Sequence, residues 1–453
     1  MTVPATFAAG AIYDDLLQAA LRRFFPRAVL ETESVLSLSS TGRLSMDPTS
    51  DPAALAVRWF GTRHVLRVPE SMPFTVHEVR VARTIGAVLS TRYRAMFDPN
   101  LMTQRPDLFQ GAIEDRYIGA FLDATAYGST DEQSSRADLI ASALEVLRVA
   151  ALSSYENRPI SSGLLLLDAD DDPCAHAAAP GWSLHYSQQL TRVKAFYRLC
   201  DGLRTLFLVA RDGRLLSTVD VERWSAELRG TSSLSVPCAR TYEPHARATQ
   251  GNRHVCVVLS PSHEIKVFAE GAQMFTFRNA QWHLLDLEAR YELWASAVGD
   301  RVIAERLFKA ALDLADSRQG ALFVVLHEPA EALPQLVLPE ERMLEPGERV
   351  SNDQRALRRE LLSLLAARDV LALDLNVLEA LASLDGAMVL DREGRVLAAG
   401  AILRHPAGQD RSHERVEGAR TTAALAASRF GPVLKVSEDG LISFFDRERA
   451  WDI

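Results

Sequence analysis

Residues 385–403 read Asp-Gly-Ala-Met-Val-Leu-Asp-Arg-Glu-Gly-Arg-Val-Leu-Ala-Ala-Gly-Ala-Ile-Leu. The stretch predicts one strand over Met388–Leu390 and a second over Arg395–Leu403, joined by a turn over residues 391–394. The Asp-Gly pair before the first strand is typical of a turn at a strand entry. This strand–turn–strand unit is the centre from which the surrounding domain can be traced.

Further elements are predicted on both sides of this unit. Apolar residues at helical spacing indicate a helix over Arg301–Ser317, and another helix is expected after Gly418-Ala419-Arg420, as far as Ser428. A Pro- and Glu-rich loop is expected over Glu328–Val350. Three more strands are predicted: Ala321–Leu326, Val433–Ser437 and Leu441–Phe445. The pattern is that of an α/β fold with a mixed central sheet flanked by helices.

The middle of the chain repeats this order of elements. A helical stretch over Asp138–Ser153 precedes the strand Leu164–Leu167, and Asp201-Gly202-Leu203 stands where Asp385-Gly386-Ala387 stands in the later segment. We predict a degenerate second copy of the domain. The alternative is two generic α/β segments with similar turns, because Asp-Gly turns between strands are common for steric reasons alone.

The chain therefore divides into three predicted domains. Residues 1–130 form a separate N-terminal α+β module. No motif indicates its role, which could be sensory. The polar run 128–135 is predicted to be a linker. Residues 131–295 are the degenerate copy or a sensor domain, and residues 296–453 carry the motifs.

Composition excludes several classes of protein. With 47% hydrophobic residues and a net charge of −9, the chain is neither disordered nor a typical nucleic-acid binder. Its apolar runs are far shorter than the roughly 18 residues of a membrane-spanning helix. No secretory signal is visible, and four cysteines do not make a disulfide framework. We therefore expect a cytoplasmic protein.

Several residues of the last segment suit phosphoryl chemistry. Asp385 and Glu438 can hold Mg²⁺ or Mn²⁺, which prefer carboxylate oxygens. Gly418-Ala419-Arg420, just before a predicted helix, offers backbone N–H groups and a guanidinium to phosphate oxygens. The small or apolar residues that a flat adenine pocket requires are Gly386, Ala387 and Leu403.

The same residues resemble the diadenylate cyclase domain, which condenses two ATP molecules into cyclic di-AMP. The resemblance covers about residues 296–453. Asp385-Gly386-Ala387 looks like the family's D-G-A motif, and Ala398–Leu403 is similar to its A-A-C-x-L stretch. The other matching stretches are Gly320-Ala321-Leu322, Gly418-Ala419-Arg420-Thr421-Thr422-Ala423-Ala424 at the place of G-T-R-H-R-A-A, and Val436-Ser437-Glu438 at the place of V-S-E.

The resemblance implies a site and an assembly. Asp385 would activate the 3′-hydroxyl through a metal shared with Glu438, and Arg420 would hold the triphosphate of ATP. Each subunit of a homo-oligomer would carry one ATP, and two cyclase domains would meet face to face. An N-terminal sensor-like region, whose signal is unknown, would control the activity. The implied ATP-binding residues are Gly386, Ala387, Leu403, Gly418, Ala419, Arg420, Thr421, Thr422 and Ser437.

The chain departs from the family where R-H-R is expected, since Thr421 and Thr422 follow Arg420. A hydrogen bond from a charged group contributes about 1.5–3 kcal/mol and a neutral one about 0.5–1.5 kcal/mol, so triphosphate binding would weaken without compensation. Candidates for compensation are Arg404, Arg411 and Arg415. Two hypotheses stay open: an active cyclase, or a catalytically inactive protein that senses a nucleotide or cyclic dinucleotide.

Overall fold

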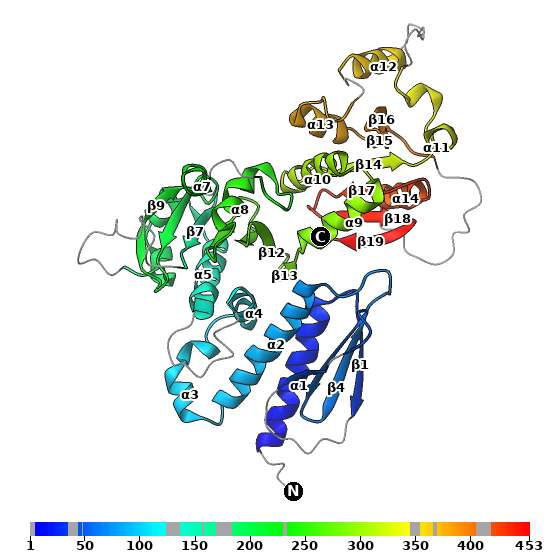
Figure 1. Cartoon of the computed structure of the whole chain (residues 1–453). Coiled ribbons are helices and arrows are strands. Elements are labelled where there is room, and N and C mark those ends of the chain that lie inside the picture. Colours follow the sequence, from blue (N-terminus) through cyan, green and yellow to red (C-terminus); the bar gives the residue numbers. More distant parts are fainter. Residues whose placement is uncertain are drawn as a thin grey trace. The chain divides into compact units, whose positions relative to one another are not determined.

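The computed structural model describes residues 5–34, 44–47, 49–123, 136–155, 158–168, 184–229, 233–344, 354–365, 369–404 and 418–453. The chain forms two compact units (Figure 1). Unit 1 comprises Met1–Leu234 with Pro244–Asp286, and unit 2 comprises Ser235–Glu243 with Leu287–Ile453. No helix in the described ranges is long and apolar enough to span a lipid bilayer.

Unit 2 contains a mixed sheet of six strands in the order β16-β15-β14-β17-β18-β19. β14 and β15 are parallel, and the other neighbouring pairs are antiparallel. The strands are β14 (Ala321–Leu326), β15 (Ala387–Asp391), β16 (Val396–Ala401), β17 (Val433–Val436), β18 (Ile442–Asp446) and β19 (Glu448–Asp452). The sequence pattern predicted the first five. It missed β19, an edge strand with mostly charged and exposed residues, which lacks a buried apolar run.

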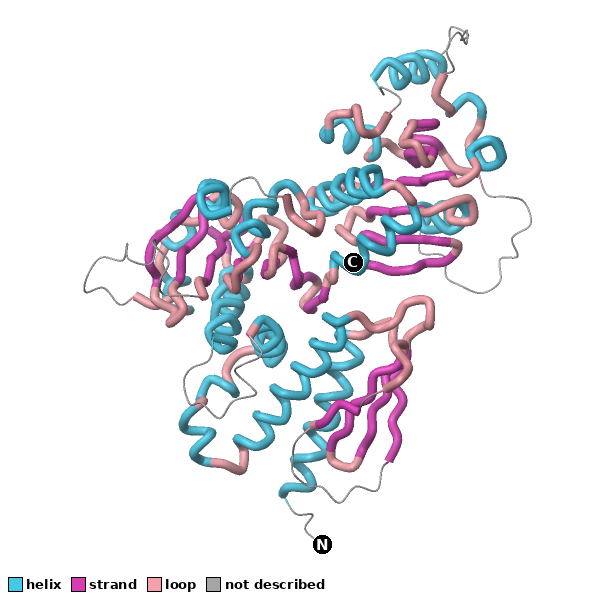
Figure 2. The backbone as a smooth tube through the Cα atoms, viewed as in Figure 1, coloured by secondary structure: helices cyan, strands magenta, loops and turns pink. Residues whose placement is uncertain are grey.

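Helices flank this sheet, as expected for the α/β class (Figure 2). They are α9 (Leu287–Val298), α10 (Arg301–Asp316), α11 (Pro329–Leu336), α12 (Gln354–Leu365), α13 (Leu375–Ala382) and α14 (Gly418–Ala427), with short 3₁₀ turns η5 (Arg240–Tyr242) and η6 (Pro339–Glu341). The loop predicted over Glu328–Val350 is partly wrong, because α11 and η6 lie within it. Pro329 is tolerated in the first turn of α11, and Ala332 and Leu336 bury one side of that helix.

One face of this sheet packs against α14. Alternate residues of β14, such as Leu322 and Val324, join Ala387 of β15 and Ala424 and Ala427 of α14 in one apolar cluster. The predicted turn between β15 and β16 is held by Asp391, whose carboxylate accepts hydrogen bonds of 2.8 Å from the backbone and side chain of Arg395. We call the side of the sheet that carries this cluster the α14 face.

Unit 1 contains a seven-stranded sheet in the order β13-β12-β11-β10-β7-β8-β9. Its strands are β7 (Ser162–Leu166), β8 (Thr205–Val209), β9 (Leu215–Asp220), β10 (Val255–Leu259), β11 (Ile265–Ala269), β12 (Ala272–Arg278) and β13 (Gln281–Leu284). β7 and β8 are parallel and all other pairs are antiparallel. Read from β9 to β12, the order and directions equal those from β16 to β19. The degenerate second copy itself stays a prediction.

The first residues of the chain add a second sheet to unit 1. It is antiparallel, in the order β1-β4-β3-β2, with the strands β1 (Val29–Ser34), β2 (Ser45–Asp47), β3 (Ala54–Trp59) and β4 (Thr62–Arg67). A two-stranded ribbon pairs β5 (Ser154–Tyr155) with β6 (Arg158–Pro159). Both large sheets share one apolar core with the helices between them. The boundary predicted near residue 130, and the linker over 128–135, lie outside the described residues at that point, and the three-domain division stays a prediction.

Among the helices of unit 1, α5 (Arg136–Ala151) matches the helical stretch predicted over Asp138–Ser153. Thr75 and Glu78 form a reciprocal capping box at the start of α2, which explains where the helix begins. The helices are α1 (Ala5–Phe24), α2 (Val76–Ala95), α3 (Pro99–Gln104), α4 (Ile113–Leu122), α5 (Arg136–Ala151), α6 (Phe196–Leu199), α7 (Val221–Arg229) and α8 (Glu243–Thr249, which begins in unit 2), with 3₁₀ turns η1 (Pro106–Phe109) and η4 (Gln188–Arg192).

Candidate functional site

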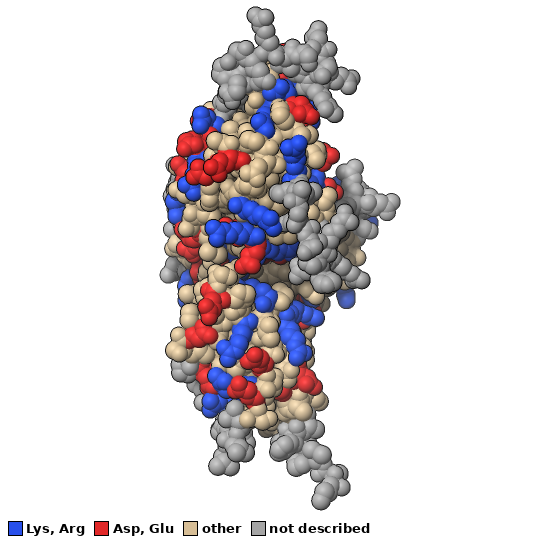
Figure 3. Space-filling view, turned by 90° about the vertical axis from the view of Figure 1, so that its right-hand side faces the viewer, with Lys and Arg blue, Asp and Glu red and all other residues tan. Residues whose placement is uncertain are grey.

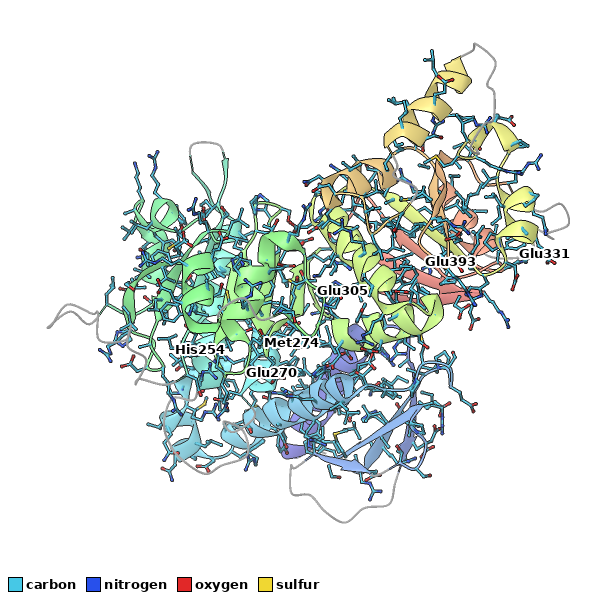
Figure 4. All side chains as sticks on the ribbon, turned by 45° about the horizontal axis from the view of Figure 1, so that its top comes forward. His254, Glu270, Met274, Glu305, Glu331 and Glu393 are labelled. Atoms are coloured by element: carbon cyan, nitrogen blue, oxygen red, sulfur yellow. The ribbon has the colours of Figure 1, made fainter. Side chains whose placement is uncertain are left out.

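The predicted site residues of unit 2 gather at one end of its sheet. Phe323 pairs with Met388 in the parallel register, so Gly320 is level with Asp385. Ala321 pairs with Val436 in the antiparallel register, so Gly320 is also level with Ser437. Since neighbouring strands lie about 4.8 Å apart, the backbones of Asp385 and Ser437 are about 10 Å apart, with β14 between them. Glu393, labelled in Figure 4, follows β15 and therefore marks the opposite end of the sheet.

Gly386 is required by the packing of β15 against β16. Its φ is +117°, and a Cβ there would lie 2.5 Å from the carbonyl carbon of Gly400 and 2.6 Å from the oxygen of Ala401. No side chain fits this close approach of two backbones. The glycine thus has a structural explanation besides the adenine pocket that the sequence suggested. The Asp385 side chain beside it is exposed.

Arg420 and Glu438 are brought into contact, although 18 residues separate them. The Nη1 atom of Arg420 lies 3.0 Å from Oε1 of Glu438. The guanidinium also lies against Gly320, where a Cβ would overlap it. The Glu438 side chain is 73% exposed, so the pair contributes little to stability and can be exchanged for other partners. The predicted triphosphate ligand and the second predicted metal ligand therefore occupy one place at the sheet end.

The two threonines after Arg420 have different surroundings. Thr421 is buried, and Nζ of Lys435 donates a hydrogen bond of 3.1 Å to its Oγ1. Thr422 is half-buried and donates a 3.3 Å hydrogen bond to the carbonyl of Gly418, within its own helix. Gly418 has a φ of +76° and open space around it, and Ala419 is exposed, so the start of α14 is accessible.

Ala387 and Leu403 are buried side chains of the α14 face. Unit 2 also has a cavity of 230 Å³, and it is lined by none of the predicted site residues. Its walls come from η6, α12 and β16: Leu338, Glu340, Glu341, Arg342, Met343, Arg358, Arg359, Leu362 and Ala399. The Arg358 guanidinium donates a 2.6 Å hydrogen bond to the carbonyl of Gly400, so part of this charge is used to hold the edge strand.

The metal prediction rests on Asp385 and Glu438 alone. Across the described ranges, no three His, Cys, Asp or Glu side chains gather closely enough to hold an ion by themselves. Mg²⁺ is commonly held by one or two carboxylates together with substrate phosphates, and both of these carboxylates are exposed. The metal and its ligands stay predictions.

Among the candidates for charge compensation, Arg404 is exposed and its backbone N–H donates to the carbonyl of Leu336. Arg411 and Arg415 lie outside the described residues. Sequence reasoning missed Lys435. The only signal was a single lysine within the apolar strand Val433–Val436.

In the middle copy, the residues at the corresponding place build the local fold. Oδ1 of Asp201 accepts backbone hydrogen bonds from Leu203, Arg204 and Thr205. Burial opposes ionisation of Asp201, but these hydrogen bonds outweigh it and lower the pKa of the carboxyl. His245 is buried against the carbonyl of Gly202, and burial lowers its pKa to about 4, which leaves it neutral at pH 7. Both side chains therefore have a structural role in unit 1.

The surface charge is mixed. On the face drawn in Figure 3, Lys and Arg side chains are interspersed with Asp and Glu side chains. Whether the chain binds nucleic acid stays a prediction.

Comparison with known proteins gives neither a matching family nor a matching curated protein. Among solved structures, a double mutant of DacA from Staphylococcus aureus is 22% identical, with a TM-score of 0.21, over 34% of this chain and 87% of that one. A hypothetical membrane spanning protein from Bacillus cereus is 19% identical, with a TM-score of 0.22, over 37% of this chain and 74% of that one. Because both TM-scores are below 0.5, the function proposed below rests on the residues of the site.

Proposed function

We propose that this chain is a diadenylate cyclase, a nucleotidyltransferase that joins two ATP molecules into cyclic di-AMP and releases two pyrophosphates. One observation carries the proposal. The register of β14, β15 and β17 brings Asp385, Ser437 and Glu438 to one sheet end, and Arg420 reaches the same place from α14. Separate sequence motifs that resemble one family thus meet in space, as a single site requires.

Each group has a chemical task in the proposed reaction. The exposed Asp385 carboxylate would orient the attacking 3′-hydroxyl, and Arg420 would bind the triphosphate by exchanging its ion pair with Glu438 for phosphate oxygens. The first N–H groups of α14 add a favourable field for phosphate. A bound Mg²⁺ or Mn²⁺ would neutralise part of the phosphate charge, with Asp385 and Glu438 as its protein ligands. Two chains would have to meet, because each would hold one ATP.

The test is incubation of the purified chain with ATP and Mg²⁺ or Mn²⁺, followed by mass spectrometry. We expect cyclic di-AMP from the natural chain and none from Asp385→Asn, since the amide cannot act as the anionic carboxylate. Asp446→Asn is the matched control, because this exposed aspartate ends β18 at the opposite end of the sheet. Absence of product at every metal and protein concentration would contradict the proposal.

A second candidate is a protein that binds the nucleotide without turnover. The Arg420–Glu438 ion pair favours it, because Glu438, the second predicted metal ligand, is bound to Arg420, and turnover needs the metal more than binding does. Thr421 and Thr422 also bring no charge that could stabilise a transition state. This candidate predicts that ATP raises the unfolding temperature by mass action while no product forms.

A further inference from the structure

The cavity of 230 Å³ in unit 2 takes no part in the proposed nucleotide site. Its walls come from η6, α12 and β16, which is the outermost strand of the sheet. Hydrogen bonds hold these walls together. The backbone N–H of Met343 donates to the carbonyl of Leu397 on β16, at 2.8 Å, and that of Leu344 donates to the hydroxyl of Ser363 on α12, at 3.1 Å. The cavity therefore lies between elements that are fixed to one another.

Two arginines of the wall use only part of their hydrogen-bonding capacity. Nε and Nη2 of Arg342 donate to the carbonyl of Val337, at 3.2 and 2.9 Å. Nη2 of Arg358 donates to the carbonyl of Gly400 at 2.6 Å and lies 3.5 Å from that of Ala399. A guanidinium has five N–H donors, so each side chain retains donors for another acceptor. Within the described part of the chain, no carboxylate forms an ion pair with either arginine.

The other charged side chains of the wall leave an excess of positive charge. They are Glu340, Glu341 and Arg359. Oε2 of Glu341 accepts a 3.1 Å hydrogen bond from the backbone N–H of Ile402, and Nε of Arg359 donates to the carbonyl of Arg342 at 2.9 Å. Since the wall contains three arginines and two glutamates, it carries one net positive charge and favours an anion over a cation.

We propose that this cavity binds a small organic anion. The carboxylate or phosphate group of the ligand would accept hydrogen bonds from Arg342 and Arg358. Its apolar part would pack against Leu338, Met343 and Leu362, which also line the cavity. At about 30 Å³ for each water molecule, the cavity has room for roughly eight waters, which suits a ligand much smaller than ATP. The proposal is independent of the proposed function.

The experiment is calorimetric titration of the full natural chain with hexanoate, butyl phosphate and hexanol. Hexanoate and butyl phosphate combine a short apolar chain with a carboxylate and a phosphate group, so the tighter of the two identifies the preferred anionic group. Hexanol has no charge. We expect at least one of the two anions to bind, and hexanol to bind at least about tenfold more weakly, because it accepts no hydrogen bond as an anion.

Variants test whether the anion lies in this cavity. Arg342→Met and Arg358→Met should each weaken binding of the anion about tenfold or more, because charged hydrogen bonds are lost. Arg392→Met is the matched control, since Arg392 is an exposed arginine of the turn between β15 and β16 and does not line the cavity. It should bind the anion as the natural chain does.

Three results would each overturn the proposal. They are a natural chain that binds neither anion, hexanol that binds as tightly as the anions, and folded Arg342→Met and Arg358→Met chains with unchanged affinity. If the two arginine variants do not fold, Leu362→Trp decides the question. The larger side chain occupies part of the cavity and removes no charge, so we expect binding to weaken about tenfold or more, and unchanged binding would refute the proposal.

Repeating the titrations with ATP and EDTA present separates the cavity from the nucleotide site. We expect the same affinity for the anion with and without ATP, because the two sites have no residue in common. Competition between ATP and the anion would place the anion in the nucleotide site and would overturn the proposal. Because the measured quantity is binding, a chain that forms no cyclic di-AMP can still confirm the anion site.

Discussion

At the scale of single residues, two glycines of the site serve different purposes. Gly386 adopts a φ of +117° and lies against the backbone of β16. Gly320 has no unusual φ, and the group that a Cβ would meet there is the guanidinium at the flexible end of Arg420. The backbone cannot move away from Gly386, whereas the Arg420 side chain can move away from Gly320. A substitution at Gly386 should therefore affect mainly the stability of the fold, and a substitution at Gly320 should affect mainly ligand binding by Arg420.

We expect Gly386→Ala to lower the free energy of unfolding by about 1–3 kcal/mol or more, through backbone strain and the clash with Gly400. Gly320→Ala should cost less than about 1 kcal/mol but should displace Arg420 and weaken tripolyphosphate binding. Urea denaturation and calorimetry measure the two effects. Equal stability losses in the two variants would show that the structural distinction is wrong.

At the scale of elements, one buried carboxylate joins three parts of unit 1. Asp115 on α4 accepts a 2.8 Å hydrogen bond from the indole N–H of Trp282 on β13 and lies 3.4 Å from the Arg148 guanidinium on α5. Burial raises the pKa of Asp115 to about 6 in spite of both partners. The contact therefore depends on pH in a definite direction.

The folded chain binds a proton at Asp115 between pH 4 and pH 6, where the unfolded chain has lost it. The contribution of this group to the free energy of unfolding therefore falls as the pH rises through that range. The Asp115→Asn variant lacks this pH-dependent loss of stability. Its free energy of unfolding, relative to that of the natural chain, should therefore rise by about 1 kcal/mol between pH 5 and pH 7.5. Urea midpoints at both pH values test this, with the exposed Asp15→Asn as the control. A relative stability that does not change with pH would refute the assignment.

At the scale of the whole molecule, six strands of the unit 1 sheet have the order and directions of the six strands of the unit 2 sheet. An exposed aspartate precedes a strand in both sheets, but only the carboxylate of Asp201 is shown to accept hydrogen bonds from three backbone N–H groups. The same Asp-Gly pair thus has a structural role in unit 1 and a proposed catalytic role in unit 2.

The two aspartates should give opposite results on substitution. Asp201→Ala should destabilise the chain by about 1–2 kcal/mol, because backbone donors lose their acceptor, and should leave ATP binding unchanged. Asp385→Ala should leave stability nearly unchanged and abolish product. Thermal unfolding and product assays on the two variants measure this contrast. Loss of ATP affinity in a stable Asp201→Ala chain would indicate a ligand site in unit 1.

The sequence by itself determined the α/β class and five strands of the unit 2 sheet, because apolar periodicity and Asp-Gly turns are local signals. It did not reveal β19, whose charged residues carry no apolar pattern, or α11, which two prolines concealed. Only the tertiary structure decided that Arg420 meets Glu438, that Gly386 is required by β16, and that Lys435 lies with Ser443 under α14. Those relations depend on strand register and on which face a side chain occupies, and pairing between distant segments sets both.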